Sequence, residues 1–242
     1  MVDTVNRGPR PGWLLDEIGS AGRENLDPEH VWRYDAKEDA GASEEVELLR
    51  AWGLLGKESV VVDLGAGTGQ FTMAAAAACA RVVAVDVSPV MLATLGRKLD
   101  AERPGNVEVV RAGFLTYEHR GRAADVVYSR YALHHLPDFW KAVALARARR
   151  MLRSGGVLRL RDVVYSFEPA ESAERIEAWC ATLPERAGPD GWKRADVEEH
   201  VREEHSTFTW LLEPMLERAG FLIEQAEYSP DGIFAAYVAR AV

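Results

Sequence analysis

The segment 60–72 constrains the fold of this chain more than any other stretch of its 242 residues. Three valines run into Asp63, and an alanine-rich stretch, 73–80, follows a few residues later. Between them lie three glycines at alternate positions: Gly65, Gly67 and Gly69. A continuous apolar run is typical of a strand buried in a parallel sheet, and glycines let a backbone approach a ligand closely. Because a helix start offers free N–H groups to a carboxylate or phosphate, the segment predicts a strand, a nucleotide-type binding turn and a helix.

The spacing of these glycines excludes two common nucleotide-binding motifs. A dinucleotide fingerprint, Gly-x-Gly-x-x-Gly, would need its third glycine at position 70 or 72, where the chain has Gln70 and Thr72. A phosphate-binding P-loop would need a Lys-Ser or Lys-Thr pair, which this turn lacks. The turn instead reads Asp-x-Gly-x-Gly-x-Gly at the end of a strand.

Four further segments have the composition of strands. They span residues 81–86, 106–110, 124–129 and 157–164. The first ends in Asp86, and an acid at such a strand end can accept hydrogen bonds from both ribose hydroxyls. The strand over 124–129 is followed by Leu-His-His-Leu-Pro-Asp at 133–138, and Gly-Gly precedes the strand over 157–164. Strands that alternate with helices in this way predict a parallel sheet with right-handed crossovers.

These motifs, in this order, resemble the class I S-adenosylmethionine (SAM)-dependent methyltransferases, in particular the quinone-biosynthesis-like subgroup of methyltransferase type 11. The resemblance covers roughly residues 45–165, with a weaker continuation to the end of the chain. It implies a Rossmann-like α/β fold, a doubly wound and mostly parallel sheet of seven strands that ends in an antiparallel hairpin over 221–228 and 232–239. It also implies transfer of the SAM methyl group to a small-molecule acceptor, with S-adenosylhomocysteine as the product.

The resemblance assigns the cofactor site to the glycine turn and to the neighbouring strand ends. Gly65 and Gly67 would meet the methionine moiety, Asp63 would position its ammonium group, and Asp86 would bind the ribose. The other cofactor contacts that we expect are Tyr34, Ala66, Val87, Gly113, Phe114 and Ser129.

Adenine recognition departs from the pattern of the family. In many relatives an acid after the third strand accepts a hydrogen bond from the adenine amino group, whereas here Gly113 stands at that position. Val87 would pack on the adenine. The amino group must then be held by backbone groups, by Phe114 or by another acceptor.

The catalytic residues are less defined, because a sulfonium donor mainly needs orientation, which can supply roughly 7–11 kcal/mol. His134 and His135 are the general-base candidates, although relatives carry this pair whatever their substrate, which favours a scaffold role. Tyr131 could flank the sulfonium or the acceptor through a cation–π interaction. Arg161 could contact the acceptor or form a structural ion pair. No cluster has the sequence spacing of metal ligands, so we expect no metal.

The charge and composition of the chain limit the classes of binding partner that we expect. The 38 acidic residues exceed the 29 basic ones, which argues against nucleic-acid binding. Cys79 and Cys180 form no disulfide framework, no apolar run reaches the ~18 residues that span a bilayer, and no signal sequence is visible. We therefore expect a cytoplasmic monomer or homodimer.

Two alternative functions stay open. One is a tRNA or protein methyltransferase, supported only by Arg159, Arg161 and the arginines of a helix near 147–153. The other is a SAM-binding protein without transferase activity.

The chain divides into an amino-terminal arm and lid, residues 1–42, and a methyltransferase domain, residues 43–242. The arm contains Tyr34 in a segment that resembles lids of small-molecule methyltransferases, and Ser43 would cap a helix over 43–55. A helical cap insertion is expected at about 165–205, with one helix over 171–181. For three tryptophans we favour a place in the core over the alternative, a place in the wall of a substrate site: Trp179, Trp192 and Trp210.

Overall fold

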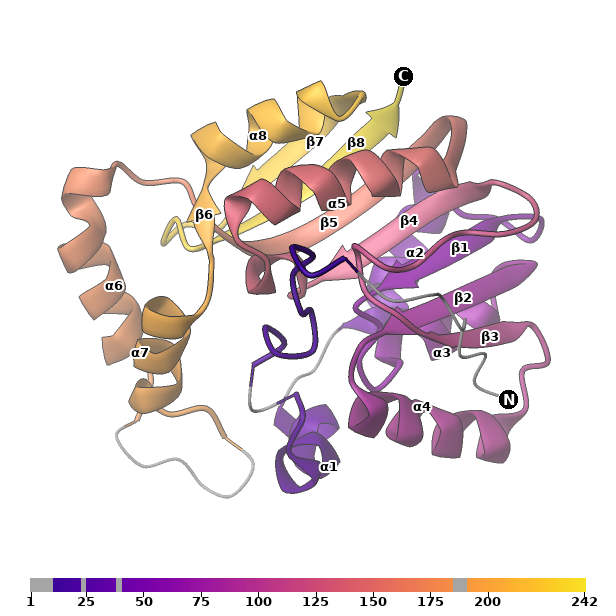
Figure 1. The fold of residues 1–242 in the computed structure, drawn as a ribbon, viewed down its shortest axis with the longest axis horizontal. Coiled ribbons are helices and arrows are strands. Elements are labelled where there is room, and N and C mark those ends of the chain that lie inside the picture. Colours follow the sequence, from indigo (N-terminus) through magenta and orange to yellow (C-terminus); the bar gives the residue numbers. More distant parts are fainter. Residues whose placement is uncertain (1–10, 23–24, 38–40, 185–190) are drawn as a thin grey trace.

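A sheet with the strand order β3-β2-β1-β4-β5-β8-β7 forms the centre of the computed structural model, which describes residues 11–22, 25–37, 41–184 and 191–242 (Figure 1). Neighbouring strands pair in parallel, except that β8 is antiparallel to both β5 and β7. The expected sheet with its terminal antiparallel hairpin is therefore confirmed. The strands are β1 Val60–Leu64, β2 Arg81–Asp86, β3 Val107–Arg111, β4 Ala124–Arg130, β5 Leu152–Tyr165, β6 Thr207–Phe208, β7 Phe221–Tyr228 and β8 Phe234–Ala241.

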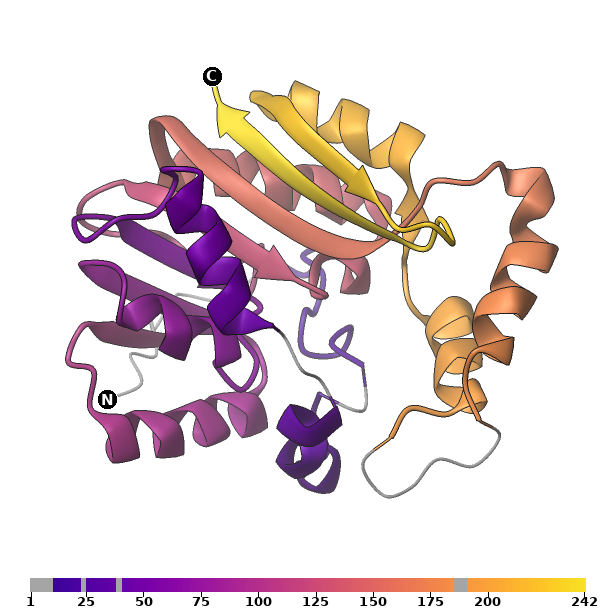
Figure 2. The ribbon, with the colours of Figure 1, turned by 180° about the vertical axis from the view of Figure 1, so that it is seen from behind.

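Helices cover both faces of this sheet. In Figure 1, α5 and α8 lie in front of the strands, and Figure 2 shows α2 and α3 on the opposite face. Away from the sheet, α6 and α7 pack against each other, and α1 lies near α4. The helices are α1 Pro28–Lys37, α2 Ala42–Ala51, α3 Gln70–Ala76, α4 Pro89–Glu102, α5 Asp138–Met151, α6 Ser172–Ala181, α7 Arg194–Glu203 and α8 Thr209–Arg218, with 3₁₀ turns η1 Leu133–His135 and η2 Pro169–Glu171.

The valines of β1 supply both layers of the core, because successive side chains of a strand point to opposite faces. Val62 joins the cluster that includes Leu145 of α5, and Val61 joins the cluster that includes Leu49 of α2. All five residues of β1 are buried. This two-sided burial fixes the strand at the centre, so that Asp63 and the glycine turn come out at the carboxyl edge of the sheet.

Several element boundaries differ from the expected ones. Helix α2 begins at Ala42, with Gly41 rather than Ser43 at its N-cap. Helix α3 ends at Ala76, because the following residues turn toward β2 and the Ala80 N–H donates to the Ser59 carbonyl. A second cap helix, α7, was not expected, since its sequence is highly charged and carries only a few apolar residues.

Two further expectations concern the burial of Trp210 and the presence of membrane-spanning helices. Trp210 is 54% exposed, so its assignment to the core is wrong. No helix in the described part of the chain is both long and apolar enough to cross a lipid bilayer.

Candidate functional site

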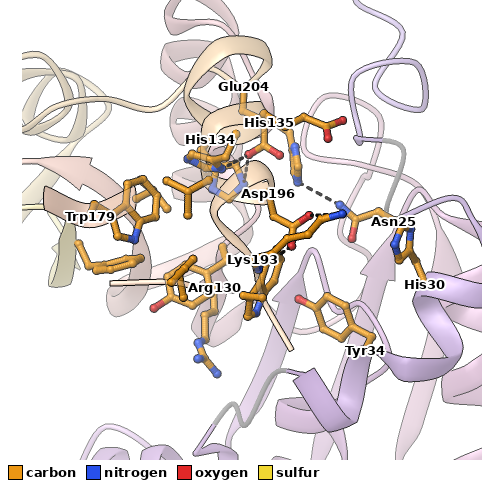
Figure 3. Close-up of a pocket in the computed structure, with 18 residues that line it drawn as sticks. Asn25, His30, Tyr34, Arg130, His134, His135, Trp179, Lys193, Asp196 and Glu204 are labelled. Atoms are coloured by element: carbon orange, nitrogen blue, oxygen red, sulfur yellow. Dashed lines mark hydrogen bonds and ion pairs between the residues drawn. The ribbon is translucent and has the colours of Figure 1, made fainter. Parts of the chain in front are cut away.

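Three adjoining cavities open at the carboxyl edge of the parallel strands. Two small cavities surround the glycine turn, and a larger one of about 550 Å³ lies toward α6 and α7 (Figure 3). Tyr34 of α1 and Arg130 and Tyr131 at the end of β4 line all three. These three side chains therefore stand where the small cavities meet the large one.

The glycine turn is held in a fixed shape by its neighbours. Gly65 has a φ of +76°, and an added Cβ would overlap the Cβ of Ala132, so no other residue fits. One carboxylate oxygen of Asp86 accepts a hydrogen bond from the Gly67 N–H at 2.8 Å, and the other accepts one from the Ser88 N–H at 2.8 Å. The acid at the end of β2 thus joins the turn to the start of α4.

Asp63 is a second carboxylate beside this turn. It accepts a hydrogen bond from the Thr72 hydroxyl at 2.6 Å. Burial raises the pKa of its carboxyl to about 7, opposed by the hydrogen bond from Thr72 and assisted by the neighbouring Asp86. Burial also raises the pKa of Asp86. A buried carboxylate, Asp63, and a half-buried one, Asp86, that line small cavities beside the turn favour a ligand with a cationic group or several hydroxyl donors.

Glu17 occupies the space that Gly113 leaves empty. A Cβ added to Gly113 would overlap the Glu17 carboxylate. That carboxylate accepts a hydrogen bond from the Leu115 N–H at 3.0 Å and another from the Thr116 hydroxyl at 3.0 Å. Glu17 is only 6% exposed and lines the same cavity as Gly113 and Phe114. The amino-terminal arm therefore brings an acid to the end of β3, where the sequence reasoning found none.

Most of the expected cofactor residues line the two small cavities. Gly65 and Gly67 line both of them. The others divide between the two: Asp63 and Ala66 in one, Asp86, Val87, Gly113 and Phe114 in the other. Ser129 lines none of the three cavities, and its buried hydroxyl has no hydrogen-bond partner among the described residues, so its predicted role gains no support from this placement.

The end of β4 has an uncommon backbone. Tyr131 has a φ of +49°, a left-handed conformation that costs a non-glycine residue about 1–3 kcal/mol. The Arg130 guanidinium lies 4.7 Å from the centroid of the Tyr131 ring, and that ring lies 5.8 Å from the ring of Phe234. Strained residues of this kind cluster at ligand sites, which agrees with the position of Tyr131 at the junction of the cavities.

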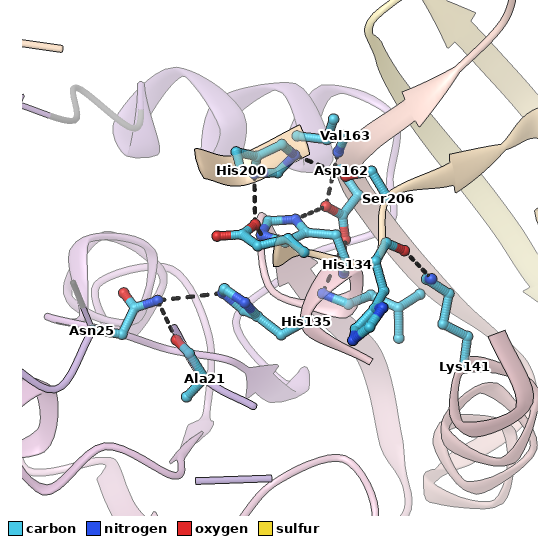
Figure 4. A network of polar contacts seen from close by, with 12 residues as sticks. Ala21, Asn25, His134, His135, Lys141, Asp162, Val163, His200 and Ser206 are labelled. Carbon is cyan, nitrogen blue, oxygen red and sulfur yellow. Dashed lines mark hydrogen bonds and ion pairs between the residues drawn. The ribbon is translucent and has the colours of Figure 1, made fainter. Parts of the chain in front are cut away.

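A polar network surrounds His134 (Figure 4). Its Nδ1 contacts the carboxylate of Asp162, and its Nε2 lies 3.0 Å from Oε2 of Glu204. Burial alone would lower the pKa of His134, but Asp162 and Glu204 together raise it to about 10. The imidazole is therefore a buried cation at neutral pH rather than a base.

His135 has the opposite electrostatic environment. Burial and the adjacent charge of His134 lower the pKa of His135 to about 3, so its ring is neutral. Its Nε2 contacts the amide of Asn25 at 3.3 Å. The arrangement holds both histidines by contacts across the chain and gives neither the pKa near 7 that suits a general base.

Arg161 lies away from the cavities. Its guanidinium forms an ion pair of 3.0 Å with Glu45 of α2, which also binds the buried Arg159 at 2.6 Å. Arg161 lines none of the three cavities, so its predicted contact with an acceptor gains no support, and its position agrees with the structural alternative.

The wall of the large cavity contains residues that the sequence reasoning missed. Trp179 and Trp192 line it, and Trp179 also packs against a buried hydrophobic cluster that includes Phe167. Lys193 and Phe234 line the same cavity. Poor periodicity over the cap left no signal for their placement, because α6, the residues just before α7 and the start of β8 bring these side chains together. The remaining lining residues include Asn25, His30, Val163, Leu183, Asp196, Val197, Glu199, His200 and Glu204.

Comparison with known proteins agrees with this geometry. Residues 61–156 match a family model described as a methyltransferase domain. An uncharacterized methyltransferase of Anoxybacillus flavithermus is 28% identical over 68% of this chain and 70% of its own, and one of Bacillus pumilus is 28% identical over 79% and 97%. The crystal structure of a SAM-dependent methyltransferase from Aquifex aeolicus has a TM-score of 0.62 at 17% identity, over 90% of this chain and 100% of that one, which shows the shared fold.

These matches do not name the quinone-biosynthesis subgroup, which stays a prediction. The strand order, the glycine turn after β1 and Asp86 at the end of β2 fit the resemblance to this family. The match over residues 61–156 and the two relatives support a place for this chain among the class I SAM-dependent methyltransferases.

Proposed function

We propose that this chain transfers the methyl group of SAM to a small molecule bound in the large cavity. The observation that carries this proposal is the set of residues common to the three cavities. Tyr34, Arg130 and Tyr131 line both the glycine-turn cavities and the large one, so a donor in the former and an acceptor in the latter would meet at these side chains. A volume of about 550 Å³ lies within the range of small-molecule sites.

The residues around the glycine turn fit the chemical groups of SAM. The Asp63 carboxylate would pair with the ammonium group, and the Asp86 carboxylate would accept hydrogen bonds from the ribose hydroxyls. Phe114 and Val87 offer apolar surface to the adenine, and Glu17 would accept a hydrogen bond from its amino group. Bound SAM supplies a methyl group already activated by a sulfonium.

The protein's contribution to the reaction is orientation and exclusion of water. Holding donor and acceptor in line can supply roughly 7–11 kcal/mol. The rings of Tyr34 and Tyr131 stand at the junction, where cation–π attraction would favour the sulfonium by about 0.5–2 kcal/mol. Because His134 stays protonated and His135 is a very weak base, neither would accept a proton from the acceptor near neutral pH.

The large cavity favours an acceptor with an aromatic or apolar body and a polar group. Trp179, Trp192 and Phe234 provide apolar surface, while Lys193 and His30 also line this cavity. Figure 3 shows Trp179 on one side of the cavity and His30 on the other. A macromolecular acceptor has less support. Most of the arginines that favoured a tRNA or protein substrate are engaged within the chain: Arg159 and Arg161 with Glu45, Arg153 with Asp125, and Arg147 and Arg149 with backbone carbonyls. Arg150 is exposed.

Calorimetric titration with SAM and S-adenosylhomocysteine, with NAD as a control, tests the donor. We expect binding of both sulfur nucleosides, none of NAD, and at least tenfold weaker SAM binding by Asp86→Asn.

Release of S-adenosylhomocysteine during incubation with a panel of small hydroxy-, thiol- and amino-aromatic compounds tests the transfer. Binding of NAD instead of SAM would overturn the donor assignment. Methylation of bulk tRNA or protein, with no turnover of small molecules, would favour the macromolecular alternative.

A further inference from the structure

Three side chains with metal-binding atoms meet on the wall of the large cavity. They are His134 of η1, His200 of α7 and Glu204 directly after α7, and their ligand atoms all lie within 4.8 Å of one another. Oε2 of Glu204 lies 3.0 Å from Nε2 of His134 and 2.5 Å from Nδ1 of His200. We propose that these three residues form a binding site for a divalent transition metal ion, with Zn²⁺ as the best-fitting ion.

The outer nitrogen of each histidine has its own partner. Nδ1 of His134 contacts the Asp162 carboxylate, and Nε2 of His200 lies 2.8 Å from the Ser206 hydroxyl (Figure 4). Metal-binding histidines nearly always have such a partner, which fixes the ring and the tautomer. Here both rings are held so that their inner nitrogens converge on Glu204.

The ligand set is the right one for zinc. Two imidazoles and one carboxylate bind Zn²⁺ in catalytic sites that keep a fourth position open. At metal–ligand distances of about 2.0–2.1 Å, two ligand atoms of a tetrahedral ion are about 3.3 Å apart. The His134–Glu204 separation is close to this value, and the His200–Glu204 separation reaches it if the carboxylate moves by less than about 1 Å. The side chains are only 7%, 14% and 15% exposed, so little water competes.

The chain spacing explains why the sequence showed no metal site. His200 lies in α7 and Glu204 follows directly after the end of that helix, four residues later, but His134 comes from η1, far away in the sequence. The packing of the cap against η1 brings the three together. Their i, i+4 pair also resembles a solvated helical ion pair, which hides the signal.

The open position faces the large cavity, because all three residues line it. If the proposed methyl transfer is correct, on which this step alone rests, the ion would bind an oxygen of the acceptor. The acceptor would then be a small molecule that carries a hydroxyl or a carboxylate. Metal binding itself involves only the three side chains, is independent of SAM, and must displace the proton from Nε2 of His134, because a metal-binding imidazole nitrogen is unprotonated.

The simpler explanation of the trio is a metal-free ion-pair network, with a proton on His134 between Asp162 and Glu204. The two explanations differ in metal affinity. The full-length protein is stripped with a chelator, dialysed and titrated with Zn²⁺ by calorimetry, and a parallel sample receives Co²⁺. We expect one equivalent of Zn²⁺ to bind with a Kd below about 1 μM and Co²⁺ to give the intense visible absorption of a tetrahedral site.

Matched variants assign the ligands. His200→Ala and Glu204→Gln should weaken Zn²⁺ binding at least 100-fold and abolish the Co²⁺ absorption, and Ser206→Ala should weaken binding about tenfold. The controls His30→Ala and Glu199→Gln alter the same cavity wall outside the trio and should bind Zn²⁺ like the unmodified chain. SAM titrations and thermal melting establish that each variant is folded. Absence of stoichiometric Zn²⁺ binding, or full binding by both ligand variants, would overturn the site and leave the proposed methyl transfer intact.

Discussion

At the scale of single residues, the fit between Glu17 and Gly113 gives the sharpest prediction about the cofactor. Glu17→Ala removes the only acid that we assign to the adenine, and a hydrogen bond to a charged group contributes about 1.5–3 kcal/mol. We therefore expect SAM to bind about 10- to 100-fold more weakly, measured by calorimetry. Gly113→Ala should have a similar effect, because its Cβ would displace the carboxylate. The neighbouring exposed Asp16 provides the control, since Asp16→Ala should leave the Kd unchanged; equal affinities for all variants would contradict the assignment.

His134 gives a prediction about pH. Its pKa in the folded protein is raised to about 10, above the value of about 6.5 in an unfolded chain. The stabilisation is therefore complete below about pH 6.5, declines above it and is lost as the pH rises through about 10. With a chelator present, His134→Gln should lower the free energy of unfolding in urea by about 3–5 kcal/mol near pH 7, because a buried carboxylate loses its partner. The difference between the two proteins should shrink strongly at pH 10.5, and a constant difference would mean that His134 is not charged.

At the scale of elements, a buried ion pair as well as apolar packing holds α2 against the sheet. Glu45 is 3% exposed and binds Arg159, which is 2% exposed and lies on β5. Glu45→Ala should destabilise the protein by about 3–5 kcal/mol, because it leaves a buried guanidinium without its carboxylate. Urea unfolding measures this loss. The double variant Glu45→Met/Arg159→Met should recover part of the stability, and a double variant less stable than Glu45→Ala would contradict this account.

Elements with a strong periodic signal could be predicted from the sequence, and the exceptions have physical reasons. The buried valines of β1 and β2 dictate parallel strands, and the glycine turn and Asp86 follow directly from them. The end of α3 could not be predicted, because alanine favours a helix wherever the chain permits one, and only the pairing of Ala80 with Ser59 ends it. Helix α7 lacks an apolar stripe of its own, since it packs on α6 and buries little beyond Val197.

At the scale of the whole molecule, contacts between distant segments decide what the sequence can reveal of the site. The glycine turn and Asp86 are local and were found, while Glu17, His200, Glu204, Trp179 and Trp192 reach the cavities only through the docking of the arm and the cap. Such contacts arise from tertiary packing, so no regular spacing of residues along a single sequence reveals them. The proposed donor site is therefore formed largely by residues at the ends of the sheet strands, and the proposed acceptor cavity depends on the segments that pack against the sheet.

This division leads to a prediction that separates acceptor binding from donor binding. Trp192 lines the large cavity but neither cavity at the glycine turn, and Trp210 is exposed outside all three. For an acceptor found by release of S-adenosylhomocysteine, Trp192→Ala should raise the KM for that acceptor about 5- to 30-fold, because an aromatic contact surface worth about 1–2 kcal/mol is lost. The Kd for SAM should stay within twofold, since the donor cavities keep their walls. Trp210→Ala should change neither constant. Weaker SAM binding by Trp192→Ala, with an unchanged KM for the acceptor, would mean that the cap closes over the donor and that the acceptor binds elsewhere.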